Sequence, residues 1–175
     1  MKNVFIILFT LLSVSLFSQE AEAEIEIYDP EIEYYKPLLE LYDWNEYQFE
    51  KTCKQPNKKV VLKLDSLSEL PKETIEKITT QFDTMTTNYG TCYKIITWDC
   101  GSPCQMLGLF KAETGQLVGK LNASYGFDYR QNSSLIIVNP PIEQHLNLQK
   151  RKLLGEPEFY KVENDMISKI PNKNE

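Results

Sequence analysis

Apolar residues recur at helical spacing in one segment of the chain. They stand three or four positions apart, with charged residues between them: Ile75, Ile78, Phe82 and Met85. Pro71 precedes this series, and the first turn of a helix accommodates proline because its missing N–H has no partner there. The pattern predicts one amphipathic helix at about residues 71–85.

The chain after this segment has the pattern of short strands separated by turns. The strand candidates are rich in β-branched and aromatic residues, and Gly, Pro, Asn and Ser gather between them. The predicted strands are 59–64, 93–98, 105–111, 116–121, 125–130, 135–138, 158–162 and 166–170. The expected fold class is α+β, a predominantly antiparallel β meander with one helix.

The first residues have the pattern of a secretory signal peptide. Lys2 supplies the positive charge, residues 4–17 form the apolar stretch, and Ser18 is a small residue before a cleavage site. Cleavage after Ala23 is an alternative. An uncleaved membrane anchor is less favoured, because the apolar stretch is shorter than the roughly 20 residues that span a bilayer. The predicted organisation is a signal peptide at 1–18, an acidic, Tyr-rich leader and N-terminal cover at 19–52, and a single β-rich domain at 53–175.

Charge limits the partners that the chain can have. The formal net charge is −6, which argues against nucleic acid or an anionic membrane surface. The clearest basic cluster, residues 150–152, is short and reads as a solvated loop. The aromatic residues of 34–49 are expected to pack on the domain. The signal peptide and the charge together lead us to expect a periplasmic or extracellular protein whose partner is another protein or an envelope component. No transmembrane segment is expected after signal cleavage.

Four cysteines in an exported chain indicate disulfide bonds, because the compartment is oxidising. Three pairings are possible. The short Gly-Ser-Pro loop favours Cys100–Cys104, which leaves Cys53–Cys92. Zinc is a weaker interpretation, because the single histidine, His145, is far away in the sequence. No metal and no organic cofactor are expected.

The segment Cys100–Cys104 also superficially resembles the Cys-Gly-Pro-Cys motif of thioredoxin-like redox proteins, with one residue inserted. In those proteins a helix begins at the first cysteine and lowers its pKa. Here a strand is expected to follow the second cysteine, so the thiolate would lack that support. A structural disulfide is the preferred interpretation, and thiol–disulfide chemistry is the alternative.

A contact patch beside this loop is the favoured site hypothesis. Aromatic residues and arginine dominate interface hot spots, and Trp98, Tyr129 and Arg130 are the candidates, with Trp98 and Arg130 expected to be exposed. Hydrolysis is less favoured, because nothing in the spacing ties together the carboxylates near turns, Asp99, Glu113 and Asp128. No catalytic residue is assigned.

Three segments carry a resemblance to a known family. They are the run Tyr93–Cys104, the turn Glu113–Gly115 and the run Tyr129–Val138. Together they resemble a family of uncharacterised exported bacterial proteins with the motif Trp-Gly-Cys-Gly-Ser/Thr-x-Cys. The resemblance covers roughly the middle third of the chain. It departs at Asp99, where the family usually has Gly, and at Ile136, where Leu is usual; Cys92 is additional.

The resemblance implies secretion and a β-rich fold, but no established activity and no catalytic residues. Taken with the residues themselves, it favours an exported, non-catalytic binding or structural protein of the bacterial cell envelope. A thiol–disulfide redox protein acting through Cys100 and Cys104 is the alternative.

Overall fold

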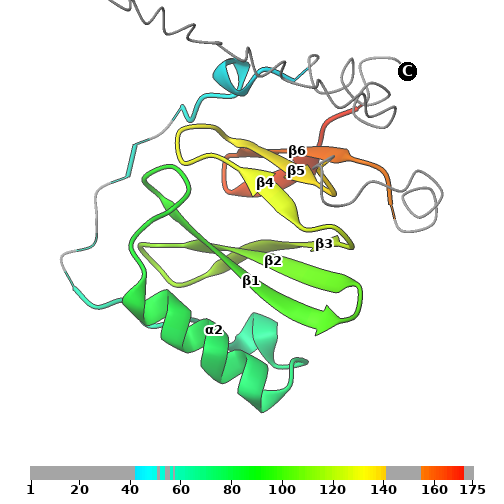
Figure 1. Ribbon diagram of the computed structural model, residues 1–175. Helices are drawn as coiled ribbons and strands as arrows, with labels where there is room; N and C mark the ends of the chain where they lie inside the picture. Colours follow the sequence, from blue (N-terminus) through cyan, green and yellow to red (C-terminus); the bar gives the residue numbers. More distant parts are fainter. Residues whose placement is uncertain (1–41, 51, 54–55, 57, 141–154, 172–175) are drawn as a thin grey trace, which may run out of the picture.

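The structure is a computed structural model that describes residues 42–50, 52–53, 56, 58–140 and 155–171. These residues form one α-helix, two short 3-10 helices and seven strands in two antiparallel sheets, stacked as layers in Figure 1. The three-stranded sheet has the order β1 (Tyr93–Gly101), β2 (Cys104–Lys111), β3 (Leu117–Ala123). The four-stranded sheet has the order β4 (Phe127–Tyr129), β5 (Leu135–Val138), β6 (Glu158–Glu163), β7 (Met166–Lys169). The predicted α+β class, dominated by antiparallel strands, is confirmed.

The meander is divided between two sheets because the chain bends sharply after β3. Gly126 adopts a φ of 81°, in the left-handed region that favours glycine, just before β4 begins. Each sheet is then a meander of its own, in which consecutive strands pair. Ile167 of β7 lies against Gly119 of β3, so the two sheets meet where one strand has no side chain.

The predicted helix is α2 (Lys72–Thr84), within one residue of the expected 71–85 at each end. Pro71 immediately precedes it. Ile78 and Phe82 are buried against the outer face of the three-stranded sheet, where the Phe82 and Phe110 rings meet edge to face at 6.1 Å. The short 3-10 helix η2 (Asp65–Leu67) leads into α2.

Alternation along β1 assigns its side chains to two different cores. Tyr93 and Ile95 are buried between the sheets. Ile96 and Trp98 are buried on the opposite face, under α2. This period of two follows from strand geometry, in which successive side chains point to opposite faces of a sheet.

The strand predicted at 59–64 is wrong. The segment belongs to no sheet; a backbone hydrogen bond joins it to the β2–β3 turn, from Lys63 N to Gly115 O at 2.9 Å. Leu62 is buried, whereas Val61 is 73% exposed. Alternating burial therefore arises here without a second strand beside the segment.

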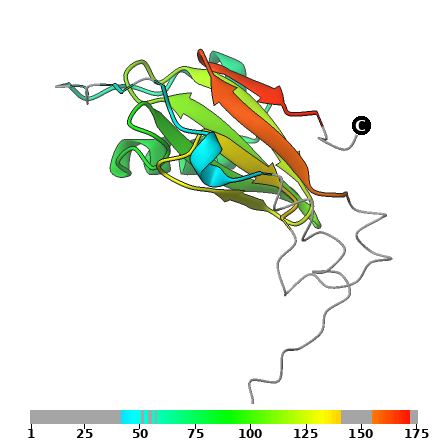
Figure 2. The same ribbon diagram turned by 90° about the horizontal axis from the view of Figure 1, so that it is seen from above.

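The described part of the N-terminal cover, residues 42–50, lies across the four-stranded sheet (Figure 2). It contains the 3-10 helix η1 (Trp44–Glu46). Tyr42 stacks on Phe159 of β6 with ring centroids 3.6 Å apart, and Tyr47 O accepts a hydrogen bond from Ser134 N at 2.6 Å. The expectation that this aromatic segment packs on the domain is confirmed for residues 42–50.

Other predictions fall outside the described residues. They are the signal peptide at 1–18, the leader up to residue 41, His145 and the basic cluster at 150–152.

Candidate functional site

The β1–β2 hairpin ends in a closed disulfide loop. Cys100 and Cys104 are bonded, with their Cα atoms 5.1 Å apart. The second disulfide, Cys53–Cys92, has a Cα–Cα distance of 4.9 Å. Both pairings predicted from the sequence are confirmed. The bond at the hairpin holds the last residues of β1 against the first residue of β2, so the loop between them has little freedom.

An open groove of about 600 Å³ lies beside this loop. That volume is within the range of about 300–1,000 Å³ that small-ligand sites occupy. One side is the hairpin and the other is the connection from β3 to β4. The lining residues are Asp99, Gly101, Ser102, Pro103, Cys104, Gln105, Ser124, Tyr125 and Gly126.

The groove exists because the hairpin extends past the covered part of its sheet. Asp99 of β1 stands directly opposite Gln105 of β2 in the register. By alternation both are on the face that contains Tyr93 and Ile95, which the four-stranded sheet buries. The four-stranded sheet does not reach the end of the hairpin, so Asp99 is exposed and Gln105 is only partly buried.

Asn139 fixes the opposite wall of the groove. Its Oδ1 accepts hydrogen bonds from the backbone N–H groups of Ser124 at 2.8 Å and of Tyr125 at 2.9 Å. Its own N–H donates to Gly126 O at 3.0 Å. Asn139 is buried and has a φ of 53°, a left-handed conformation that asparagine tolerates better than most residues. The connection is therefore held at three successive residues by one side chain and its backbone.

Three polar side chains of the groove are available to a ligand. Within the described residues, no hydrogen bond or ion pair is made by the side chains of Asp99, Gln105 and Ser124. Asp99 is the single charged residue of the lining. The cation that it influences is Lys77 of α2, whose pKa is raised chiefly by its hydrogen bond to Glu73 and to a smaller extent by the charge of Asp99. The groove thus combines fixed walls with unused acceptors and donors.

The redox interpretation lacks its structural basis at this loop. Cys104 begins β2, and no helix starts at either cysteine of the hairpin. A thiolate at Cys100 would therefore receive no support from a helix N-terminus.

The three residues proposed as a contact patch lie in different places. Trp98 is only 8% exposed and packs under α2, so the expectation that it is exposed is wrong. It occupies an even-numbered position of β1, and these positions face the helix. Tyr129 is half-buried in the core between the sheets. Arg130 is exposed, as expected, and its guanidinium lies 4.6 Å from the centre of the Trp44 ring.

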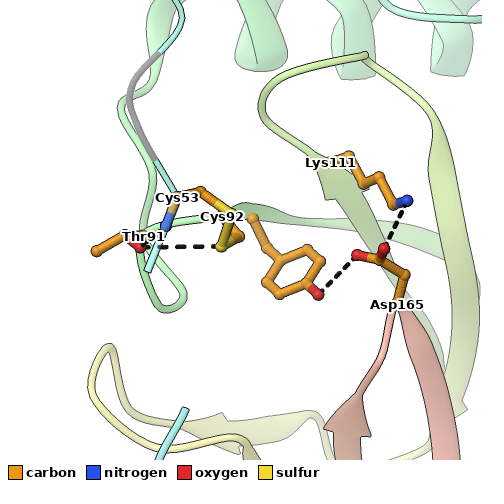
Figure 3. Close-up of a disulfide and its surroundings, with 6 residues drawn as sticks. Cys53, Thr91, Cys92, Lys111 and Asp165 are labelled. Carbon is orange, nitrogen blue, oxygen red and sulfur yellow. Dashed lines mark hydrogen bonds and ion pairs between the residues drawn. A yellow bond between two sulfur atoms is a disulfide. The ribbon is translucent and has the colours of Figure 1, made fainter. Parts of the chain in front are cut away.

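A second polar cluster lies at the other end of the inter-sheet space (Figure 3). Asp165, in the β6–β7 turn, accepts a hydrogen bond from the Tyr93 hydroxyl at 2.9 Å and pairs with Lys111 at 2.7 Å. Burial and the hydrogen bond to Asp165 raise the pKa of Tyr93. The cluster joins the two sheets beside the Cys53–Cys92 bond.

A cavity of about 200 Å³ adjoins this cluster, between residues 48–50 and the β6–β7 turn. Most of its charged groups already have partners, since Lys161 pairs with Glu163 at 3.0 Å and Asp165 pairs with Lys111. The cluster therefore reads as a structural link between the sheets, and the hairpin groove is the better candidate site.

Sequence reasoning missed the groove although it identified the disulfide loop. The sequence marks Asp99 as a carboxylate near a turn, but Gln105 and Ser124 carry no local signal. They meet Asp99 because of the β1–β2 register and the fold-back of the chain after β3. Asn139 does carry a weak signal, since it stands between a very apolar strand and two prolines, where a left-handed residue can end a strand.

Among the described residues, no group of three or more His, Cys, Asp or Glu side chains is arranged to hold a metal ion. The helices in the same part of the chain lack the length and apolar character needed to cross a membrane. Comparison with protein-family models, with curated proteins and with solved structures finds no match for this chain.

Proposed function

We propose that this chain is an exported, non-catalytic binding protein of the bacterial cell envelope and that the groove beside the Cys100–Cys104 hairpin is its binding site. The export part of the proposal rests on the signal-peptide pattern of residues 1–18 and is compatible with two disulfide bonds. The binding part rests on the groove.

One observation carries the proposal: the side chains of Asp99, Gln105 and Ser124 have no partner among the described residues, and they stand on two walls that the fold restrains. A rigid wall lowers the conformational entropy that a ligand must overcome on binding. The disulfide restrains one wall, and Asn139 restrains the other. Functional residues are commonly found on such loops, held by a stable scaffold.

The redox alternative makes a different prediction about the same bond. A redox disulfide must be reduced and reformed during its reaction, whereas a structural disulfide must stay oxidised. We would map the disulfides of the mature protein by mass spectrometry and titrate their reduction. A potential below about −300 mV for Cys100–Cys104 supports a structural bond. A potential of about −120 to −200 mV, with a reactive Cys100, would make the chain an oxidoreductase.

Binding itself is tested by NMR on the isotopically labelled mature protein. Three probes cover the envelope chemistry: soluble peptidoglycan fragments, neutral oligosaccharides and short basic peptides. We expect one of them to shift the resonances of residues 102–105 and 124–126. The variant Ser124→Arg, which fills the groove with a long side chain, should abolish the shift, and Asn132→Arg, in an exposed turn outside the groove, should not.

Two results would contradict the proposal. One is that none of the three probes shifts the groove resonances at millimolar concentration. The other is that Ser124→Arg and Asn132→Arg bind the active probe equally well, because the contact would then lie elsewhere.

A further inference from the structure

The outer edge of β1 is partly occupied by a side chain that imitates a neighbouring strand. Ile95 N donates to Asn88 Oδ1 at 2.7 Å, and Asn88 Nδ2 donates to Ile95 O at 2.9 Å. Two residues earlier, Tyr93 N donates to Tyr89 O at 3.3 Å. The amide of Asn88 thus satisfies the two backbone groups that a paired strand would satisfy.

These bonds fix which backbone groups of β1 point outward. Because Ile95 bonds to Asn88 with both its N–H and its C=O, odd-numbered residues direct these groups away from β2. Even-numbered residues direct theirs toward β2: Cys92 O accepts a hydrogen bond from Ala112 N at 2.8 Å on that side. The register between β1 and β2 is regular from Tyr93 to Asp99. Thr97 and Asp99 therefore also direct their N–H groups outward.

Beyond Ile95, the residue that Asn88 bonds, the outer edge of β1 is unpaired in the part of the chain that the structure describes. Within the described residues, no backbone hydrogen bond is formed on this outer side by Thr97 or Asp99. Unpaired groups along an edge strand are a template for another extended chain. Thr97 is half-buried and Asp99 is exposed, next to the groove.

We propose that an extended peptide adds to the outer edge of β1 at Thr97–Asp99, beside the groove, and reaches the groove with a basic side chain next to Asp99. This inference rests on the proposed function and names its partner. Backbone hydrogen bonds supply affinity in this mode of recognition, and alternate side chains supply specificity. The added strand is antiparallel or parallel to β1, and either direction uses the same outward groups.

The charge of the partner follows from Asp99. The Asp99 side chain points to the face of the sheet that contains the groove. Every second side chain of an added strand would point to the same face and lie beside Asp99. Opposite charges on neighbouring strands are favourable and like charges are not. The acidic residues of the chain's own leader, such as Glu24 and Glu26, are therefore disfavoured here, and lysine or arginine is favoured.

The probe is the capped seven-residue peptide Thr-Val-Thr-Lys-Thr-Val-Thr, added to the labelled mature protein. Thr97→Pro removes the outward N–H, and an edge strand tolerates proline where its N–H faces outward. Thr97→Val keeps the N–H and the β-branched shape, and is its matched control. Asp99→Asn removes the charge alone. Disulfide mapping and circular dichroism establish that each variant is folded.

We expect the Thr97 and Asp99 amides to exchange rapidly in the free protein and to become protected by the peptide. Thr97→Val should bind like the wild type, and Thr97→Pro should bind about tenfold more weakly, the order of one or two lost hydrogen bonds. Asp99→Asn should weaken the Lys peptide but not the same peptide with Glu in place of Lys. A peptide N-methylated at alternate amides tests the pairing without any protein variant and should not bind.

Four results would overturn the inference: no binding of the Lys peptide at millimolar concentration, equal binding by Thr97→Pro and Thr97→Val, equal binding of the N-methylated peptide, or amides at Thr97 and Asp99 that are already protected in the free protein. If another probe still shifts residues 102–105 and Ser124→Arg blocks it, the groove remains a binding site. The peptide inference alone then fails.

Discussion

The buried side chain of Asn139 holds the backbone of Ser124 in place, with Oδ1 2.8 Å from the Ser124 nitrogen. The same oxygen accepts from Tyr125 N at 2.9 Å. One acceptor after β5 thus determines the path of the chain between β3 and β4. It also shapes one wall of the candidate binding groove.

Replacing Asn139 by Ala should loosen this connection and lower the free energy of unfolding by about 1–3 kcal/mol, because two backbone donors lose their acceptor. Asn139→Asp keeps an acceptor at the same place and should cost less. Urea denaturation gives the stability, and hydrogen exchange of the Ser124 and Tyr125 amides reports the local effect. Unchanged exchange in Asn139→Ala would show that the connection is held by other contacts.

The two disulfides should differ in their contribution to stability. Cys53 and Cys92 are 39 residues apart in sequence, whereas Cys100 and Cys104 are 4 apart. By loop-closure entropy, opening the first should cost about 4 kcal/mol and opening the second about 2 kcal/mol. Paired Cys→Ser variants, compared by thermal denaturation, test the order. A larger loss for the Cys100/Cys104 variant would contradict the entropic account and point to a role in folding of the hairpin.

Trp98 should behave as a core residue. It lies under α2, and its indole Nε1 is buried without a hydrogen-bond partner among the described residues. Trp98→Ala should cost about 3–5 kcal/mol, the usual loss for a large buried aromatic residue. Trp98→Phe should cost less, because it fills most of the volume and removes the unpaired donor.

Fluorescence distinguishes Trp98 from Trp44, the only other tryptophan of the sequence. Trp44 is partly exposed and Trp98 is buried. A soluble quencher should therefore reach Trp44 and leave most of the Trp98 emission unchanged in the Trp44→Phe variant. Strong quenching in that variant would show that the Trp98 ring is exposed and would contradict its burial under α2.

Stability should fall at both ends of the pH range through one cluster on β6 and β7. Glu158 accepts hydrogen bonds from Lys169 at 2.6 Å and from Tyr160 at 2.7 Å. The bond from Lys169 is the main cause of a lowered pKa of Glu158. Burial and then the bond to Glu158 raise the pKa of Tyr160 to about 12.

The directions follow from these shifts. A lowered carboxyl pKa gives stability that is complete above the ordinary value of 4.5 and is lost as the pH falls through the folded-state pKa. A raised tyrosine pKa gives stability that is complete below the ordinary value of 10.0 and is lost as the pH rises toward about 12. Tyr160→Phe should flatten the alkaline arm of a plot of stability against pH, and Lys169→Met the acid arm. Identical curves for both variants and the wild type would contradict the assignment.

Local patterns were sufficient for most secondary structure. The helix at 71–85 and the strand at 135–138 were predicted within a residue, because a 3.6-residue or near-continuous apolar pattern reflects one buried face. The segment 59–64 failed because alternating burial shows only that one side is covered. A strand also needs a hydrogen-bonded neighbour, which no local pattern specifies.

The sequence by itself determined the class of fold, the Cys100–Cys104 pairing and the approximate positions of seven strands, because these depend on composition and on contacts between residues close in the chain. The Cys53–Cys92 pairing joins residues far apart in the chain and followed only as the pair that was left. The tertiary structure decided that the strands form two sheets, that Trp98 faces α2, and that Asp99, Gln105 and Ser124 meet in a groove. Those outcomes depend on register and on the direction of the chain after β3. A one-residue change in register reverses every side chain of a strand, so the face that Trp98 and Asp99 occupy is fixed only when the sheets pack.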